Sequence, residues 1–159
     1  MSYEVRLKNM AAQPTLSIRG VTTFPALSQT IGEFLSEVWN HLEAMGTAPA
    51  GPPFTRYHGV DARGIDLEAG LPLLAPAADD GRIRAGELPG GEVISTDHIG
   101  PYDNLPDAGE ALNAWLGANG RHAAGPNWEV YWTDPGSTRN SAEWRTEVLK
   151  PLAPAGEVG

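Results

Sequence analysis

Apolar and polar residues alternate at the start of the chain, where Tyr3, Val5 and Leu7 are separated by charged residues. A period of two is typical of a half-buried β-strand. A second strand is predicted over residues 15–22. Because only a short Ala11-Ala12 segment and a few further residues separate the two, we expect them to form a hairpin.

The hydrophobic period then changes from two to that of a helix. One stripe of apolar residues contains Ile31, Phe34, Leu35, Val38, Trp39, Leu42 and Met45. This spacing predicts a helix of about four turns. Gly46 follows at once and is the expected left-handed stop. Strands are predicted next, over residues 54–58 and 64–71.

The same series of elements recurs in the second half of the chain. Strands are predicted on either side of Pro89-Gly90-Gly91, which is a hairpin signal. A helix follows from Pro106 or Asp107 to a stop at Gly120. The predicted strands of this half span 83–88, 92–99, 128–133 and 144–150.

Equivalent residues of the two halves lie at constant separations. Gly46 and Gly120, Phe54 and Trp128, and Tyr57 and Tyr131 are each 74 residues apart, and Pro72 and Pro151 are 79 apart. Matches in register indicate a duplicated ββαββ unit. We therefore predict an α+β fold with pseudo-twofold symmetry, with two helices on one sheet face and a ligand groove on the other.

The predicted organisation is a single domain over residues 1–152. Its repeat halves cover about 3–74 and 82–152. The segment 153–159 has no periodicity and is expected to be a flexible tail. A chain of 159 residues is long enough for one such domain.

Charge and composition exclude several classes of function. The formal net charge is −9, which disfavours nucleic acid and membrane surfaces as partners. The chain has no cysteine, so disulfides, thiolate metal sites and cysteine nucleophiles are excluded. The N-terminus has no secretion signal, and we expect a cytoplasmic location.

No motif indicates a cofactor or a metal. Nucleotide-binding glycine loops, a nucleophile elbow and a zinc-protease motif are all missing from the sequence. Glu37 and His41 share a helix face, but such a pair is more often a solvated contact than a metal site. We therefore expect neither a cofactor nor a metal.

Two glutamates in the last two strands are candidates for ligand chemistry. In the strand 128–133, alternation places Trp128 and Trp132 on one face, expected to meet the helices, and Glu129 and Tyr131 on the other. If Glu147 of the following strand shares the face of Glu129, two carboxylates look into one cleft. Burial among aromatic rings would raise the pKa of at least one of them.

The first half offers matching groups. Tyr57 occupies the repeat position of Tyr131, and Glu68 that of Glu147. Carboxylates among aromatic rings suit a planar, apolar, cationic guest, because the rings supply contact area and the acid compensates the charge. Weaker candidates for the groove are Tyr102, Trp39 and Phe24.

Four segments, in this order, resemble the GyrI-like small-molecule-binding family. The segments are His98-Ile-Gly-Pro-Tyr102, Ala114-Trp-Leu-Gly-Ala-Asn-Gly120, Pro126-Asn-Trp-Glu-Val-Tyr131 and Trp144-Arg-Thr-Glu-Val-Leu-Lys-Pro151. Members of the family are effector-binding domains of AraC- and MerR-type multidrug-responsive regulators, or stand-alone proteins. The resemblance implies the duplicated ββαββ fold, and pocket glutamates at Glu129 and Glu147 that hold lipophilic cations.

The expected function is stand-alone binding of hydrophobic, planar, often cationic or electrophilic small molecules. Some stand-alone members of the family resemble hydrolases that open cyclopropane-bearing genotoxins. In that alternative Glu147 or Glu129 would be the general base, and Tyr131 would donate a hydrogen bond. A second alternative is an inhibitor of a larger protein, for which the sequence names no partner.

Overall fold

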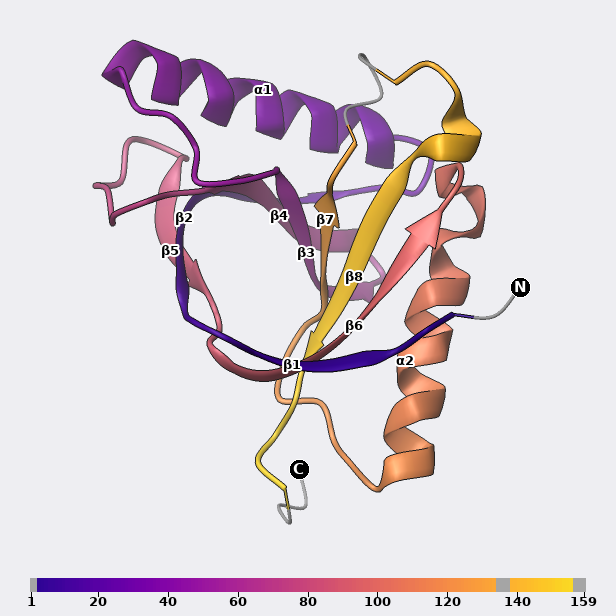
Figure 1. Cartoon of the computed structure of the whole chain (residues 1–159). Helices are drawn as coiled ribbons and strands as arrows, with labels where there is room; N and C mark the ends of the chain where they lie inside the picture. The colour runs from indigo at the N-terminus through magenta and orange to yellow at the C-terminus, as the bar shows by residue number, and fades with distance from the viewer. Residues whose placement is uncertain (1–2, 134–137, 156–159) are drawn as a thin grey trace. The chain divides into compact units, whose positions relative to one another are not determined.

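The computed structural model describes residues 3–133 and 138–155, and the chain divides into two compact units (Figure 1). Unit 1 comprises Met1–Ala11 with Gly90–Gly159, and unit 2 comprises Ala12–Pro89. Each unit combines antiparallel strands with a long helix that covers one face of them. The predicted α+β class is confirmed.

Unit 2 contains the longer of the two α-helices. Its elements are β2 (Gln13–Thr22), α1 (Leu27–Met45), β3 (Phe54–Asp61), β4 (Gly64–Pro72) and β5 (Arg84–Leu88). The strands are ordered β3-β4-β2-β5 and neighbours run antiparallel. Along α1, Phe34, Val38 and Leu42 are buried against Leu16, Ile18, Leu67 and Ala69 of β2 and β4. The helix ends at Gly46, whose φ of 69° is the predicted left-handed stop.

Unit 1 has the same plan. Its elements are β1 (Arg6–Met10), β6 (Gly91–Ile99), the 3-10 helix η1 (Tyr102–Asn104), α2 (Leu105–Asn119), β7 (Trp128–Tyr131), the 3-10 helix η2 (Ser141–Glu143) and β8 (Arg145–Pro151). The strand order is β1-β6-β8-β7. Ala108 and Leu112 of α2 pack on Ile94, Val148 and Leu152, and Figure 1 shows α2 beside β6. Within the described residues, no helix is long and apolar enough to cross a membrane.

The strand register supports the sequence repeat. In unit 2, Glu68 of the inner strand β4 lies opposite Arg19 of β2 and Arg56 of β3. In unit 1, Glu147 of the inner strand β8 lies opposite Asp97 of β6 and Val130 of β7. The separation of 79 residues between Glu68 and Glu147 is the same as between Pro72 and Pro151. Each glutamate therefore occupies the same place in its unit.

Both predicted hairpins are wrong. β1 pairs with β6 instead of β2, and β5 pairs with β2 instead of β6. Unit 1 therefore contains β1, the first strand of the first sequence half, and unit 2 contains β5, the first strand of the second half. Two-residue hairpins favour turns with positive φ, and Ala11-Ala12 has no such residue, because every positive-φ residue described is glycine. Pro89 fixes a negative φ, which likewise does not suit the turn types that match strand twist.

The C-terminal segment is anchored further than predicted. Leu152 and Ala153 are buried, and the amide of Ala153 donates to the carbonyl of His122 at 2.9 Å. Arg121 Nη2 also donates to the carbonyl of Ala153, at 3.2 Å. Ala153, the first residue of the expected tail, is therefore packed and hydrogen-bonded within unit 1. Residues 156–159 of that tail lie outside the described part of the chain.

Candidate functional site

The two candidate glutamates of unit 1 lie on opposite faces of the strands. Across β7 and β8, Glu129 is opposite Val148, whereas Glu147 is opposite Val130. Directly opposite residues share a face, and neighbours along a strand alternate. Val148 belongs to the core under α2. Glu129 and Tyr131 are thus on the α2 face and Glu147 is on the helix-free face, so the expected cleft with both carboxylates is wrong.

The same register reverses the predicted faces of the tryptophans. Trp128 is opposite Leu149 and therefore shares the helix-free face with Glu147. Trp128 is fully buried, but not against α2 as expected. Trp132 is 46% exposed and donates its indole N–H to Glu147 Oε1 at 3.0 Å. Neither ring therefore belongs to the core under α2, and Trp132 instead contacts Glu147.

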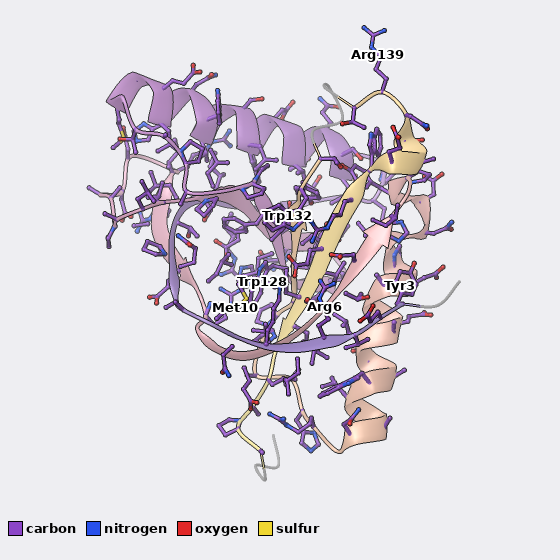
Figure 2. The ribbon with its side chains drawn as sticks, viewed as in Figure 1. Tyr3, Arg6, Met10, Trp128, Trp132 and Arg139 are labelled. Atoms are coloured by element: carbon purple, nitrogen blue, oxygen red, sulfur yellow. The ribbon has the colours of Figure 1, made fainter. Side chains whose placement is uncertain are left out.

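Glu147 is held by cations from the edge strand β1. It is 3% exposed, and Lys8 Nζ lies 2.5 Å from its Oε2. Arg6 Nη2 lies 3.6 Å from the same oxygen. Arg6 and Trp132, both labelled in Figure 2, belong to opposite sides of β8: Arg6 lies in β1, beyond β6, and Trp132 directly follows β7. The carboxylate is therefore neutralised from within the chain.

These contacts decide the charge state of Glu147. Burial raises the pKa of a carboxyl, but hydrogen bonds from Lys8, Trp132 and Ser95 and the charge of Lys8 outweigh it. The pKa of Glu147 is consequently lowered from its ordinary value. Glu147 is therefore not an acid whose pKa burial raises, as was expected of at least one of the two glutamates.

A second ion-pair group borders Glu147. Asp97 accepts hydrogen bonds from Arg6 at 3.0 and 3.3 Å, and Arg145 Nε lies 3.3 Å from Asp97 Oδ1. The guanidinium carbon of Arg145 is 5.0 Å from the centre of the Trp132 ring, a cation–π distance. The burial of Asp97 raises its pKa, but the hydrogen bond from Arg6 and the charge of Arg145 lower it by more. Both acids of this face are therefore held ionised.

The sequence pattern does not predict Lys8 and Arg6 as partners of Glu147. They are 139 and 141 positions away, and the predicted hairpin would have placed β1 beside β2. One signal was present. Arg6 and Lys8 alternate with apolar residues, so both cations fall on one strand face and require counter-charges there.

Glu129 belongs to an aromatic group on the α2 face, which we call the Glu129 cluster: Glu129, Tyr131, Tyr102 and Trp144. Glu129 is 8% exposed and accepts a hydrogen bond from the Tyr131 hydroxyl at 2.9 Å. The ring of Tyr102, in η1, lies 6.1 Å from that of Tyr131 and 4.9 Å from that of Trp144. One buried carboxylate thus accepts a hydrogen bond from a tyrosine that belongs to a group of three neighbouring aromatic rings.

In unit 2, Glu68 has the partners expected of a repeated position. Its carboxylate accepts from Ser17 Oγ at 2.7 Å, just as Glu147 accepts from Ser95 of the equivalent strand. His58 Nε2 lies 2.8 Å from Glu68 Oε1, and Arg56 Nη1 lies 3.8 Å from it. A β-bulge between Tyr57 and Gly59 gives His58 its place there. Glu68 is therefore part of a polar network on the helix-free face of unit 2.

The other predicted ligand residues of unit 2 lie elsewhere. Tyr57 packs against the core under α1, on the face opposite Glu68. Trp39 is 45% exposed on α1 and donates to Glu43 Oε1 at 2.9 Å. Phe24 is 70% exposed before the start of the helix. Within unit 2, the structure does not bring these three residues together with Glu68.

A surface cleft of about 560 Å³ lies beside the first turns of α2. It is lined by Tyr3, His98 and Pro101 on one side and by Asp107 and Glu110 of α2 on the other. None of the ligand residues predicted from the sequence is among those that line it. In the described part of the chain, no group of three or more His, Asp or Glu side chains could hold a metal ion.

Solved structures with the same fold include the C-terminal domain of EcmrR, with a TM-score of 0.84 and 25% identity over 96% of this chain and 99% of that one. SAV2435 bound to tetraphenylphosphonium has a TM-score of 0.61 and 13% identity, covering 97% and 95% of the two chains. A hydrolase from Listeria innocua has a TM-score of 0.65 and 13% identity, covering 94% and 92%. No curated protein matches the sequence significantly.

The family assignment covers almost the whole chain. Residues 3–153 match the GyrI-like small molecule binding domain. This range contains every described strand and helix of both units. The chain therefore belongs to the GyrI-like small-molecule-binding family.

Proposed function

We propose that the protein binds planar, hydrophobic, often cationic small molecules at the Glu129 cluster. The observation that carries the proposal is the hydrogen bond between the buried Glu129 carboxylate and Tyr131. The ring of Tyr131 lies next to that of Tyr102, which lies next to that of Trp144. Aromatic faces attract cations, and an adjacent carboxylate compensates their charge. Tetraphenylphosphonium, the ligand bound to SAV2435, is a hydrophobic aromatic cation and serves as a probe of the preference for positive charge.

Glu147 is less suited to a cationic ligand. Lys8 and Arg6 already supply positive charge to its carboxylate. A cationic guest would have to displace an intramolecular ammonium group, and the gain in electrostatic energy would be offset by the loss of that pair. We therefore assign a structural role to Glu147. The contact of Glu129 with Tyr131, beside the rings of Tyr102 and Trp144, supports Glu129 as the counter-charge.

The hydrolase alternative uses a glutamate as general base. The lowered pKa of Glu147 makes its carboxylate a weaker base, and its oxygens accept hydrogen bonds from Lys8 and Trp132. Ring opening of a cyclopropane-bearing electrophile beyond one equivalent, lost in Glu129→Gln or Glu147→Gln, would support the hydrolase. Recovery of the compound intact after denaturation would support binding.

The binding experiment titrates tetraphenylphosphonium and a neutral aromatic compound of similar shape into the wild-type protein and three variants. Glu129→Gln keeps the shape of the side chain and removes its charge, so cation affinity should fall by about fivefold or more. Glu147→Gln tests the other acid. Glu87→Gln is the control, because Glu87 is an exposed glutamate of unit 2 and its loss changes the net charge equally.

The outcomes separate the two acids. The proposal holds if Glu129→Gln weakens binding of the cation and leaves binding of the neutral compound nearly unchanged. It is wrong if the cation and the neutral compound bind equally well to the wild type. It is also wrong if Glu147→Gln, but not Glu129→Gln, removes the preference for the cation.

A further inference from the structure

The surface cleft beside α2 is separate from the Glu129 cluster. Its volume is about 560 Å³, and the residues that line it all belong to unit 1. None of the residues of the Glu129 cluster is among them. Clefts of this volume hold small molecules in other proteins. A ligand could therefore occupy this cleft without contact with the Glu129 cluster.

One wall of the cleft is a stripe of α2. Asp107, Glu110, Ala111 and Ala114 line it, and their spacing of three, four and seven positions from Asp107 places them on one helix face. The alanine side chains are small and leave room in front of the helix. Neither carboxylate forms a hydrogen bond or an ion pair with another residue that the structure describes. The wall therefore carries two acids that no cation of the described chain neutralises.

The opposite wall contains a chain of hydrogen bonds through His98. His98 is 2% exposed, and its Nε2 lies 2.9 Å from the carbonyl oxygen of Pro101. Its Nδ1 lies 2.9 Å from the hydroxyl oxygen of Tyr3, which Figure 2 labels. A carbonyl oxygen only accepts, so Nε2 donates, and in the neutral ring Nδ1 accepts the hydrogen of Tyr3. The Tyr3 oxygen has then donated its single hydrogen and can only accept from a ligand.

The rings of this wall are held in place by stacking. The centres of the Tyr3 and His98 rings are 6.0 Å apart, with 23° between the ring planes. Burial and the charge of Asp107 raise the pKa of Tyr3 from its ordinary value, so the phenol keeps its proton. Lys and Arg are both missing from the residues that line the cleft. The two walls thus present negative charge and hydrogen-bond acceptors to whatever enters.

We propose that this cleft is a second binding site, specific for small alkylguanidinium ions. A guanidinium group has several N–H donors in one plane and pairs with carboxylates through parallel hydrogen bonds. It also stacks on aromatic rings, and the ring of Tyr3 lines the cleft. Ile99 and Pro101 provide apolar surface for a short alkyl chain. The site goes beyond the proposed function, because it uses other residues and requires N–H donors.

The test titrates butylguanidinium into isotope-labelled protein and follows the backbone amides by NMR. Butyltrimethylammonium is the comparison ligand, because it has the same charge and alkyl chain but no N–H donor. Butylguanidinium should shift amides within residues 98–101 and 107–114. It should bind about fivefold more tightly than butyltrimethylammonium or better, since only the guanidinium can donate hydrogen bonds to the acids.

Variants test the two walls separately. Asp107→Asn and Glu110→Gln should each weaken binding of butylguanidinium by about threefold or more, because each removes a charged acceptor. Asp103→Asn is the matched control, since Asp103 is an exposed acid of η1 that does not line the cleft. Tyr3→Phe keeps the aromatic ring and removes the acceptor oxygen, so it should also weaken binding.

Several results would overturn the proposal. They are equal affinities for the two cations, shifts confined to amides outside the two segments, and a loss in Asp103→Asn as large as that in Asp107→Asn. Displacement of butylguanidinium by excess tetraphenylphosphonium would also overturn it, because the two cations would then share one site. A failure of tetraphenylphosphonium to bind would contradict the proposed function and leave the guanidinium site standing.

Discussion

Glu147 shows how much one carboxylate depends on residues that are distant in sequence. Its side chain is almost fully buried, and it remains ionised because Lys8, Trp132 and Ser95 donate to it. A buried charge without such partners would be strongly destabilising. At the residue scale, the helix-free face of unit 1 is therefore stabilised by a network of charges that must be kept complete.

This network predicts a pH dependence of stability. The pKa of Glu147 is lower in the folded protein, so its stabilising effect is complete above the ordinary value of 4.5 and is lost as the pH falls through the folded value. Glu147→Gln should reduce the free energy of unfolding by about 2 kcal/mol near pH 7, with a smaller difference from wild type in acid. Urea unfolding of both proteins between pH 7 and pH 3 measures this.

The control for that experiment removes both partners. The double variant Lys8→Met with Glu147→Gln leaves neither charge unpaired, so it should be more stable than the sum of its single variants implies. The free energy of unfolding of the wild type should fall more between pH 7 and pH 3 than that of Glu147→Gln. An equal decrease in the two proteins would contradict the ionised state of Glu147.

At the scale of elements, the inner strand β4 needs a glycine where β2 passes close to it. A Cβ atom added to Gly70 would lie 2.1 Å from the carbonyl oxygen of Leu16 and 2.6 Å from Cβ of Ser17. These are backbone and β-carbon positions, which cannot move away without displacing the strand. The close approach also brings Ser17 to Glu68.

Gly70→Ala should therefore destabilise the protein by about 2 kcal/mol or more, since overpacking forces the backbone to shift. Gly59→Ala is the matched control, because Gly59 lies in the neighbouring strand β3 and an added Cβ would meet no atom within 4 Å. Thermal unfolding of both variants provides the comparison. Equal melting temperatures would show that β2 and β4 are not as close as described.

At the scale of the whole molecule, the exchange of first strands links the two sequence halves. β1 comes from the first half and pairs with β6 of the second, and β5 of the second half pairs with β2 of the first. Each compact unit is thus assembled from both halves of the chain. A break at the repeat boundary would not release either unit intact.

The exchange predicts where the loss of β1 is felt. A chain lacking residues 1–10 should lose amide protection in β6, whose edge becomes exposed, while α1 and β4 of unit 2 keep theirs. Hydrogen exchange followed by mass spectrometry measures both regions. Full-length Lys8→Met is the control, because it keeps strand β1 and removes only the charge of Lys8. Faster exchange in α1 and β4, with β6 unchanged, would rule out the described pairing.

The sequence by itself determined the elements and their repeat. The apolar stripe from Ile31 to Met45 and the stops at Gly46 and Gly120 are local signals, and the structure has both helices and both left-handed glycines. The separation of 79 residues predicted that Glu68 and Glu147 are equivalent, and both lie in the inner strand of a unit. Periodicity and turn preferences act over a few residues, so they can be found without knowing the fold.

Only the tertiary structure decided which strands pair and which residues share a face. A change of one position in register moves a side chain to the other face, and no local pattern fixes register between strands far apart in sequence. The register of β7 with β8 separated Glu129 from Glu147, and the pairing of β1 with β6 brought Lys8 to Glu147 across 139 positions. The candidate chemistry was visible in the residue types. The pairing of β1 with β6 decided that Glu147 is neutralised by Lys8, and the register of β7 with β8 decided that Glu129 lies on the face of the aromatic rings.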